Sequence, residues 1–198
     1  MRDPSGWAGG RPPADDGGVP FDATPVVSRI ASGDRDWVAE TLVREWTSTS
    51  VARLGELVEA AELPGHLATL EGRRVGLVLV DVRHREYEVV AISTSEPRRG
   101  VGRALMERCF AEARATGCRR VWLVTTNNNI TAIAFYQRLG MDLRALHRHA
   151  LRVSRELKAT IPERDAAGVR IDHELEFEVL LDSAPWGGGV WVTARRPE

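Results

Sequence analysis

The sequence predicts an α+β domain in which helices pack on both faces of a mixed, mostly antiparallel sheet. Apolar runs with the length of strands alternate with one-sided helical patterns along most of the chain. A length of 198 residues suits one domain with tails, and a hydrophobic content of 43% is enough for an ordinary core.

The predicted domain covers residues 24–182. Residues 1–23 are rich in Gly, Pro and Asp, and we expect a disordered tail because this segment cannot bury enough apolar surface to offset its ordering entropy. Residues 183–198 contain a run of glycines between Trp186 and Trp191, and we expect either a loose C-terminal tail or an extra edge strand.

Composition and charge exclude several classes of function. A net charge of -1 with 28% charged residues gives no general attraction to nucleic acid or to a membrane surface. No apolar run approaches the roughly 20 residues that span a bilayer, and the start of the chain lacks the apolar region of a secretory signal. Cys109 and Cys118 show no spacing pattern, so we expect buried thiols and a reducing, cytoplasmic environment.

The first half of the domain is expected to start with a strand over residues 26–30, followed by a helix that Ser32 or Asp34 caps. A second helical pattern covers residues 51–61. Strands are then expected over residues 66–70, 75–80 and 86–92. The middle strand is almost continuously apolar, which indicates a strand covered on both faces.

The second half begins with a helix over residues 101–115, whose apolar side chains share one face and whose stop signal is Gly117. The elements expected after it are a strand over 119–125, a helix over 129–139, a strand over 141–146, a helical stretch over 147–158 and a strand over 175–180.

A glycine-rich turn opens the helix that starts at Val101. Helix N-termini carry N–H groups without intrahelical partners and a partial positive charge, so they bind phosphate groups. Gly100 and Gly102 remove side chains where a pyrophosphate would approach the backbone. Positive charge at the rim comes from Arg98, Arg99 and Arg103. The other interpretation is a plain strand-to-helix turn that requires positive φ.

Two other nucleotide motifs do not fit this turn. A dinucleotide-binding fingerprint has a third glycine, and Leu105 stands in its place. A P-loop requires Gly-Lys-Ser/Thr, which this turn lacks. A nucleotide-binding α/β protein is therefore a rival interpretation that the motif itself argues against.

The next helix carries Asn129, Ala132 and Tyr136 three and four residues apart, which places them on one face. Asn129 could bond backbone or cofactor amides at the helix start, and the small side chain of Ala132 lets a cofactor arm lie close. Alternatively, Tyr136 is a core aromatic and residues 127–129 form a turn with an N-cap.

Together, the two segments resemble the signatures of the GNAT family (Gcn5-related N-acetyltransferases), and the resemblance to a bacterial subgroup of unassigned substrate extends over about residues 25–180. The first signature, Arg/Gln-x-x-Gly-x-Gly/Ala, matches at Gly100 and Gly102, whereas Pro97 replaces Arg or Gln. The resemblance implies the acyl-CoA N-acyltransferase fold. It also implies acetyl-CoA as co-substrate, held by amides of the turn such as that of Val101.

The resemblance further implies an acid and a base. Tyr136 would protonate the departing thiolate. The base is often a glutamate on the strand before the turn, where Glu86 and Glu88 share one face. The alternating positions hold Val89, Ala91 and Ser93. We choose Glu88 because it lies deeper in the strand; the other interpretation is a solvated edge carboxylate.

Further contacts rest on the same analogy. Backbone groups of Ile92 and Ser93 would pair with the pantetheine arm as an added strand would. The acceptor pocket is expected at Trp37, Trp46, Arg53 and residues 147–174. The histidines of this region lack the close spacing of metal ligands, so no metal is expected at His147, His149 or His173.

The predicted function is the transfer of an acetyl group from acetyl-CoA to a primary amine of a small molecule, by direct attack. A peptide N-terminus or a lysine would also fit as the acceptor. The alternative is a catalytically idle acyl-CoA-binding or regulatory module that retains the turn. No nucleic-acid or membrane partner is expected, and a homodimer is compatible with the sequence.

Overall fold

The computed structural model describes residues 24–181, so both predicted tails lie outside the described residues. A seven-stranded sheet has the order β1-β4-β5-β6-β7-β9-β8, and β2 and β3 form a separate two-stranded sheet. The strands are β1 (Val26–Arg29), β2 (Ser50–Arg53), β3 (Glu56–Glu59), β4 (Gly65–Leu70), β5 (Arg73–Arg83), β6 (Glu86–Thr94), β7 (Arg120–Thr126), β8 (Asp142–His147) and β9 (Glu174–Leu180). The α-helices are α1 (Arg35–Trp46), α2 (Val101–Ala115), α3 (Ile130–Arg138) and α4 (Ala150–Leu157).

The predicted fold class is confirmed by the strand pairing. Neighbouring strands of the large sheet are antiparallel except for β6 and β7, which run parallel and are joined by α2. A parallel pair needs such a crossover, because a tight turn can join only antiparallel strands. The helix therefore starts where β6 ends and returns the chain to the start of β7.

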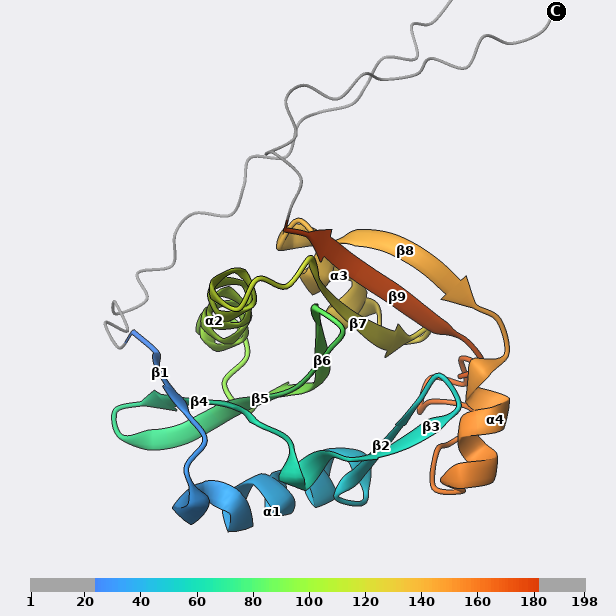
Figure 1. Ribbon diagram of the computed structural model, residues 1–198. Coiled ribbons are helices and arrows are strands. Elements are labelled where there is room, and N and C mark those ends of the chain that lie inside the picture. The colour runs from blue at the N-terminus through green and yellow to red at the C-terminus, as the bar shows by residue number, and fades with distance from the viewer. Residues whose placement is uncertain (1–23, 182–198) are drawn as a thin grey trace, which may run out of the picture.

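The sheet divides the core into two layers (Figure 1). Val78 and Val80 of β5 face the cluster that contains residues of α2 and α3, whereas Leu77 and Leu79 face the cluster built with α1. This alternation explains why β5 is apolar at consecutive positions: both of its faces are buried, as the sequence predicted. Among residues 24–181, no helix is both long and apolar enough to cross a membrane.

The helix predicted over residues 51–61 is wrong. This segment forms the β2–β3 hairpin, in which Val51 lies opposite Val58. Leu54 and Gly55 both have positive φ, 48° and 74°, as a two-residue hairpin turn requires. The apolar spacing in this short segment fits either a helix or a pair of strands, and packing of α4 against the hairpin decides between them.

The start of α1 also differs in detail from the prediction. Ser32–Asp34 form a short 3₁₀ turn, and the Asp34 carboxylate accepts the Ala31 N–H at 2.9 Å instead of capping α1. The predicted helix over 101–115 matches α2, and Gly117 follows it with φ of 69°.

A bulge in β6 changes which of its residues share a face. Leu79 pairs with Ala91 and Val80 with Val89, so Val90 is an extra residue in the strand. The predicted alternation of Val89, Ala91 and Ser93 is therefore wrong for Val89, whereas Ala91 and Ser93 still occupy alternate positions, opposite Leu79 and Leu77. Val89 belongs to the α2 layer and Ala91 to the α1 layer.

Candidate active site

The central cavity lies where β6 and β7 separate. These strands pair only between Glu86–Glu88 and Arg120–Trp122. Beyond this point, a cavity of about 360 Å³ is lined by residues 89–92 of β6, residues 124–126 of β7 and Tyr136 of α3. No described strand pairs with the β7-facing edge of β6 along this stretch, so its backbone groups remain available to an extended ligand.

The N-terminus of α2 starts from Gly100, whose φ is 76°. A Cβ built on Gly100 would meet no atom within 4 Å, so the space in front of the helix is open. The first turn-closing hydrogen bond joins Ala104 N to Gly100 O at 2.9 Å. The amides of Val101, Gly102 and Arg103 precede that bond and are placed to receive an anion.

Gly102 has a packing role that the sequence did not reveal. A Cβ there would lie 3.2 Å from the Phe135 ring of α3. The missing side chain therefore lets α2 and α3 approach each other, whatever the helix terminus binds.

Arg98 and Arg103, two of the arginines predicted at the rim of the turn, differ in backbone conformation and in side-chain contacts. Arg98 adopts a positive φ of 63° in the turn before α2. Arg103 lies on the first turn of α2, 3.5 Å from Glu107, with both side chains exposed. These cations lie at the same end of the molecule as the open helix terminus, and a role for Arg98, Arg99 or Arg103 in binding stays a prediction.

Tyr136 is 6% exposed and packs between two aromatic rings. Its ring centroid lies 5.4 Å from that of Phe135 and 5.8 Å from that of Phe177. Burial raises the pKa of the Tyr136 hydroxyl. A tyrosine hydroxyl is protonated at neutral pH even without this shift, and the protonated form is the one that a proton donor needs.

Several predicted cofactor residues come together here, and others do not. Ile92, Asn129 and Tyr136 all line the cavity, whereas the turn at 98–103 lies outside it. Asn129 also caps α3, because its side-chain oxygen accepts the Ala132 N–H at 3.2 Å. Ala132 packs against the α2 layer, and neither it nor Ser93 lines the cavity.

Glu88, the predicted base, lies beside the cavity and is tied to Arg53 of the hairpin. Arg53 Nη2 donates to Glu88 Oε2 at 2.7 Å, and Arg53 Nε contacts the other carboxylate oxygen. Burial raises the pKa of Glu88, and the charge of Arg53 opposes that rise. Glu88 lines a second hollow with Glu86 and Trp122, so it does not share a cavity with Tyr136, and its catalytic role stays a prediction.

Glu174 was missed by the sequence reasoning. It is the first residue of β9, is 2% exposed and lines the cavity that contains Tyr136. Its Oε2 accepts the Leu54 N–H at 2.8 Å, and burial raises its pKa against the opposing effect of this hydrogen bond. The sequence feature that could have revealed Glu174 is the alternation of Glu with apolar residues along β9, which places a row of carboxylates on one face.

Part of the residue set predicted for the acceptor pocket lies at the cavity. Trp46 and Arg53 line it, whereas Trp37 packs against the α1 layer instead. Lys158, just after α4, adds a cation that donates to Ser50 O at 2.7 Å. Burial lowers the pKa of Lys158.

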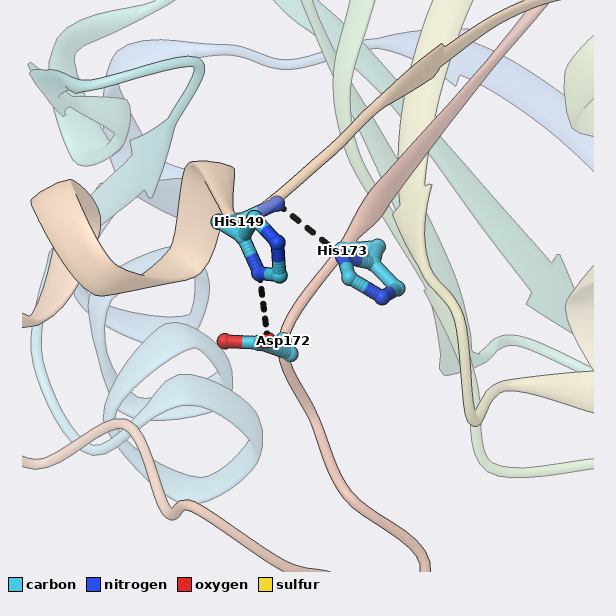
Figure 2. A group of neighbouring side chains, drawn as sticks. All are labelled: His149, Asp172 and His173. Atoms are coloured by element: carbon cyan, nitrogen blue, oxygen red, sulfur yellow. Dashed lines mark hydrogen bonds and ion pairs between the residues drawn. The ribbon is translucent and has the colours of Figure 1, made fainter.

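His149, Asp172 and His173 form a compact group outside this cavity (Figure 2). His149 Nδ1 lies 2.6 Å from Asp172, and the backbone N–H of His149 donates to His173 Nδ1 at 3.0 Å. Arg152 donates twice to the same aspartate, at 3.1 and 3.2 Å. An arginine already balances the carboxylate, so the group resembles a polar junction that holds α4 to the irregular segment before β9 more than a cation site. The expectation of no metal stays a prediction.

Comparison with known proteins places the chain in a family. The acetyltransferase (GNAT) family matches residues 35–141, which is more than half of the chain. The uncharacterized protein YdhI of Bacillus subtilis (strain 168) is 29% identical over 146 residues, covering 73% of this chain and 91% of YdhI.

Solved structures agree on the fold. An IAA acetyltransferase from Bacillus cereus ATCC 14579 superposes with a TM-score of 0.64 at 16% identity, over 80% of this chain and 100% of that one. A GNAT family acetyltransferase from Elizabethkingia anophelis, solved with acetyl-CoA bound, gives a TM-score of 0.57 at 14% identity, over 79% and 98% of the two chains. The family match over residues 35–141 shows that the chain belongs to the GNAT acetyltransferase family, and the open α2 terminus and the separated β6–β7 pair agree with it.

Proposed function

We propose that the protein is an N-acetyltransferase that transfers the acetyl group of acetyl-CoA to a primary amine of a small molecule by direct attack. The observation that carries this proposal is the position of Tyr136 in the cavity between β6 and β7, at the end of the sheet where α2 begins. The start of α2 would bind the pyrophosphate group, the unpaired edge of β6 would bind the extended arm, and Tyr136 would face the leaving thiolate.

Different residues of the chain would bind the cofactor and donate the proton. The amides of Val101, Gly102 and Arg103 would hold the pyrophosphate, because they are the unpaired donors of a helix N-terminus. The unpaired edge of β6 at residues 90–92 would pair with the amides of the pantetheine arm. Acetyl-CoA supplies an activated thioester, and the Tyr136 hydroxyl would give its proton to the sulfur as the C–S bond breaks.

The shape of the acceptor side favours a small amine. Trp46, Lys158 and Pro162 lie around a cavity of about 360 Å³, a volume in the range of small-molecule sites. An amine that enters from this side meets the end of the β6 edge, where the thioester would lie. A protein substrate would have to insert one side chain or its N-terminus into the same space.

Two measurements test the proposed function. The first is calorimetric titration with acetyl-CoA, CoA and a nicotinamide dinucleotide, in which we expect binding of the two CoA species only. The second follows thiol release from acetyl-CoA with a panel of primary amines. Failure to bind acetyl-CoA would refute the proposal, whereas binding without turnover on any amine would favour an idle acyl-CoA-binding module.

A further inference from the structure

The carboxylates of β9 differ in how they are neutralised. Glu174, Glu176 and Glu178 occupy alternate positions of the strand. Arg120 donates to Glu176 at 2.8 Å and to Glu178 at 2.9 Å, so these two belong to a charge network outside the cavity. Glu174 makes no ion pair among residues 24–181, and within this range its carboxylate accepts a hydrogen bond from the neutral N–H of Leu54.

Glu174 also differs from Glu88, the other buried glutamate near the site. Both oxygens of Glu88 contact the guanidinium of Arg53. A carboxylate held in this way by a permanent cation is a poor base, because protonation would break the ion pair. Glu174 is held by the Leu54 N–H without an ion pair to a cation, and it lines the same cavity as the proposed acid Tyr136.

We propose that Glu174 is the base that deprotonates the acceptor amine. This inference rests on the proposed function, because it assigns the second proton-transfer group of the same reaction. It also places the acceptor between the β2–β3 hairpin and the start of β9, opposite the cofactor side of the cavity.

The proton balance of the step is complete with these two residues. The acceptor enters as an ammonium ion and gives one proton to Glu174, which returns it to solvent after turnover. The free nitrogen then bonds to the thioester carbon, the C–S bond breaks, and the sulfur takes the proton of Tyr136. The second proton on the nitrogen restores the phenol through solvent, which leaves an amide and CoA as a thiol.

The surroundings of Glu174 give the expected pH response. The titratable and charged groups that face this region are Arg53 from β2, His147 from β8, Glu45 from the end of α1 and Lys158 after α4. Burial raises the pKa of Glu174, while Arg53 and His147 oppose the rise. Activity should therefore fall at acid pH as Glu174 becomes protonated, with a midpoint above that of an ordinary glutamate.

A structural role is the competing explanation, since Glu174 also holds the Leu54 turn. Glu174→Gln keeps an oxygen that can accept the Leu54 N–H but removes the base. We expect kcat to fall by roughly 10²-fold, the acid limb of the pH profile to disappear, and the acetyl-CoA affinity and Tm to stay near those of the wild type. Glu174→Asp, which retains a carboxylate, should recover part of kcat and the acid limb.

The matched control is Glu178→Gln, on the same face of β9 but outside the cavity, which should keep the wild-type profile. Each variant is assayed with the best amine of the panel, and acetyl-CoA hydrolysis, with water in place of the amine, gives a second readout. A wild-type kcat and acid limb in Glu174→Gln would overturn the proposal, as would a lowered Tm with an unchanged pH profile. Wild-type protein that fails to bind acetyl-CoA would instead refute the proposed function.

Discussion

The proposed cofactor side and the proposed acceptor side of this molecule are built in different ways. The cofactor side consists of the end of β6, the start of α2 and the helix α3, which lie within about fifty residues of one another in the chain. The acceptor side joins segments that are far apart: Lys158 donates to Ser50 O, and Leu54 N–H donates to Glu174, 108 and 120 residues away.

This difference explains where each side gets its stability. The cofactor side is held by aromatic and aliphatic packing, as in the contact of Gly102 with Phe135. The acceptor side is held by buried polar contacts between the hairpin and its neighbours, such as Arg53 with Glu88. Polar contacts of this kind depend on both partners, so substitutions on the two sides should have different consequences.

The largest effect is expected from Arg53→Met on the acceptor side. Glu88 would be left buried without its cation, at a cost of about 3–5 kcal/mol in the free energy of unfolding. Burial raises the pKa of Glu88 above its unfolded value, and loss of the opposing Arg53 charge would raise it further. A raised folded-state pKa gives stability that is present at low pH and lost as pH rises through that pKa, so the defect should be greater at pH 8 than at pH 5.

Urea unfolding of Arg53→Met at the two pH values measures this effect. The double variant Arg53→Met/Glu88→Gln is the control and should recover much of the loss at pH 8, because it removes the unpaired charge. A single variant as stable as the wild type at pH 8 would show that the ion pair does not hold the hairpin.

Tyr136→Phe tests the proposed proton donor, which lies in the cavity between the cofactor side and the acceptor side. We expect kcat to fall by roughly 10²-fold because the sulfur loses its proton donor. The acetyl-CoA affinity and Tm should change little, since Phe keeps the packing against Phe135 and Phe177. Steady-state kinetics and calorimetry check both parts, and an unchanged kcat would exclude Tyr136 as the acid.

Gly102→Val tests the cofactor side. It asks whether the glycine is needed for the packing of α2 against α3 or for the approach of the pyrophosphate to the backbone. The new side chain would press on Phe135, and overpacking of this kind costs about 1–3 kcal/mol. We expect a lower Tm and weaker acetyl-CoA binding. Phe135→Ala in the same chain should relieve the contact between the helices. If binding then returns, the glycine serves packing; if only Tm improves, the glycine is needed for the approach of the pyrophosphate.

The smallest effect is expected from Trp46→Ala, compared with Trp37→Ala on the same helix. Trp46 lines the cavity, so its loss should raise the acceptor KM by roughly tenfold without changing acetyl-CoA affinity. Trp37 packs against the α1 layer, so its loss should lower Tm and leave KM unchanged. Equal effects of the two substitutions on KM would mean that the acceptor does not reach Trp46.

The contrast between segments that are close in the chain and segments that are far apart also explains which predictions from sequence succeeded. Helix α2 was predicted with its observed bounds, because a one-sided apolar period, an opening glycine and Gly117 are all local signals. The burial of β5 on both faces was predictable for the same reason. The segment 51–61 failed because a few apolar positions suit both periods, and only the contacts of the hairpin with α4 and β9 choose the strand.

For the site, the sequence by itself determined the family signatures and the face of α3 that carries Tyr136, since both depend on spacing within one helix or turn. Only the tertiary structure decided which carboxylate enters the cavity. The bulge at Val90 and the ion pair with Arg53 place Glu88 to one side, and the contact between the hairpin turn and the start of β9 brings in Glu174. The ion pair and the contact with β9 join residues 35 and 120 positions apart, and their energies do not appear in any local pattern.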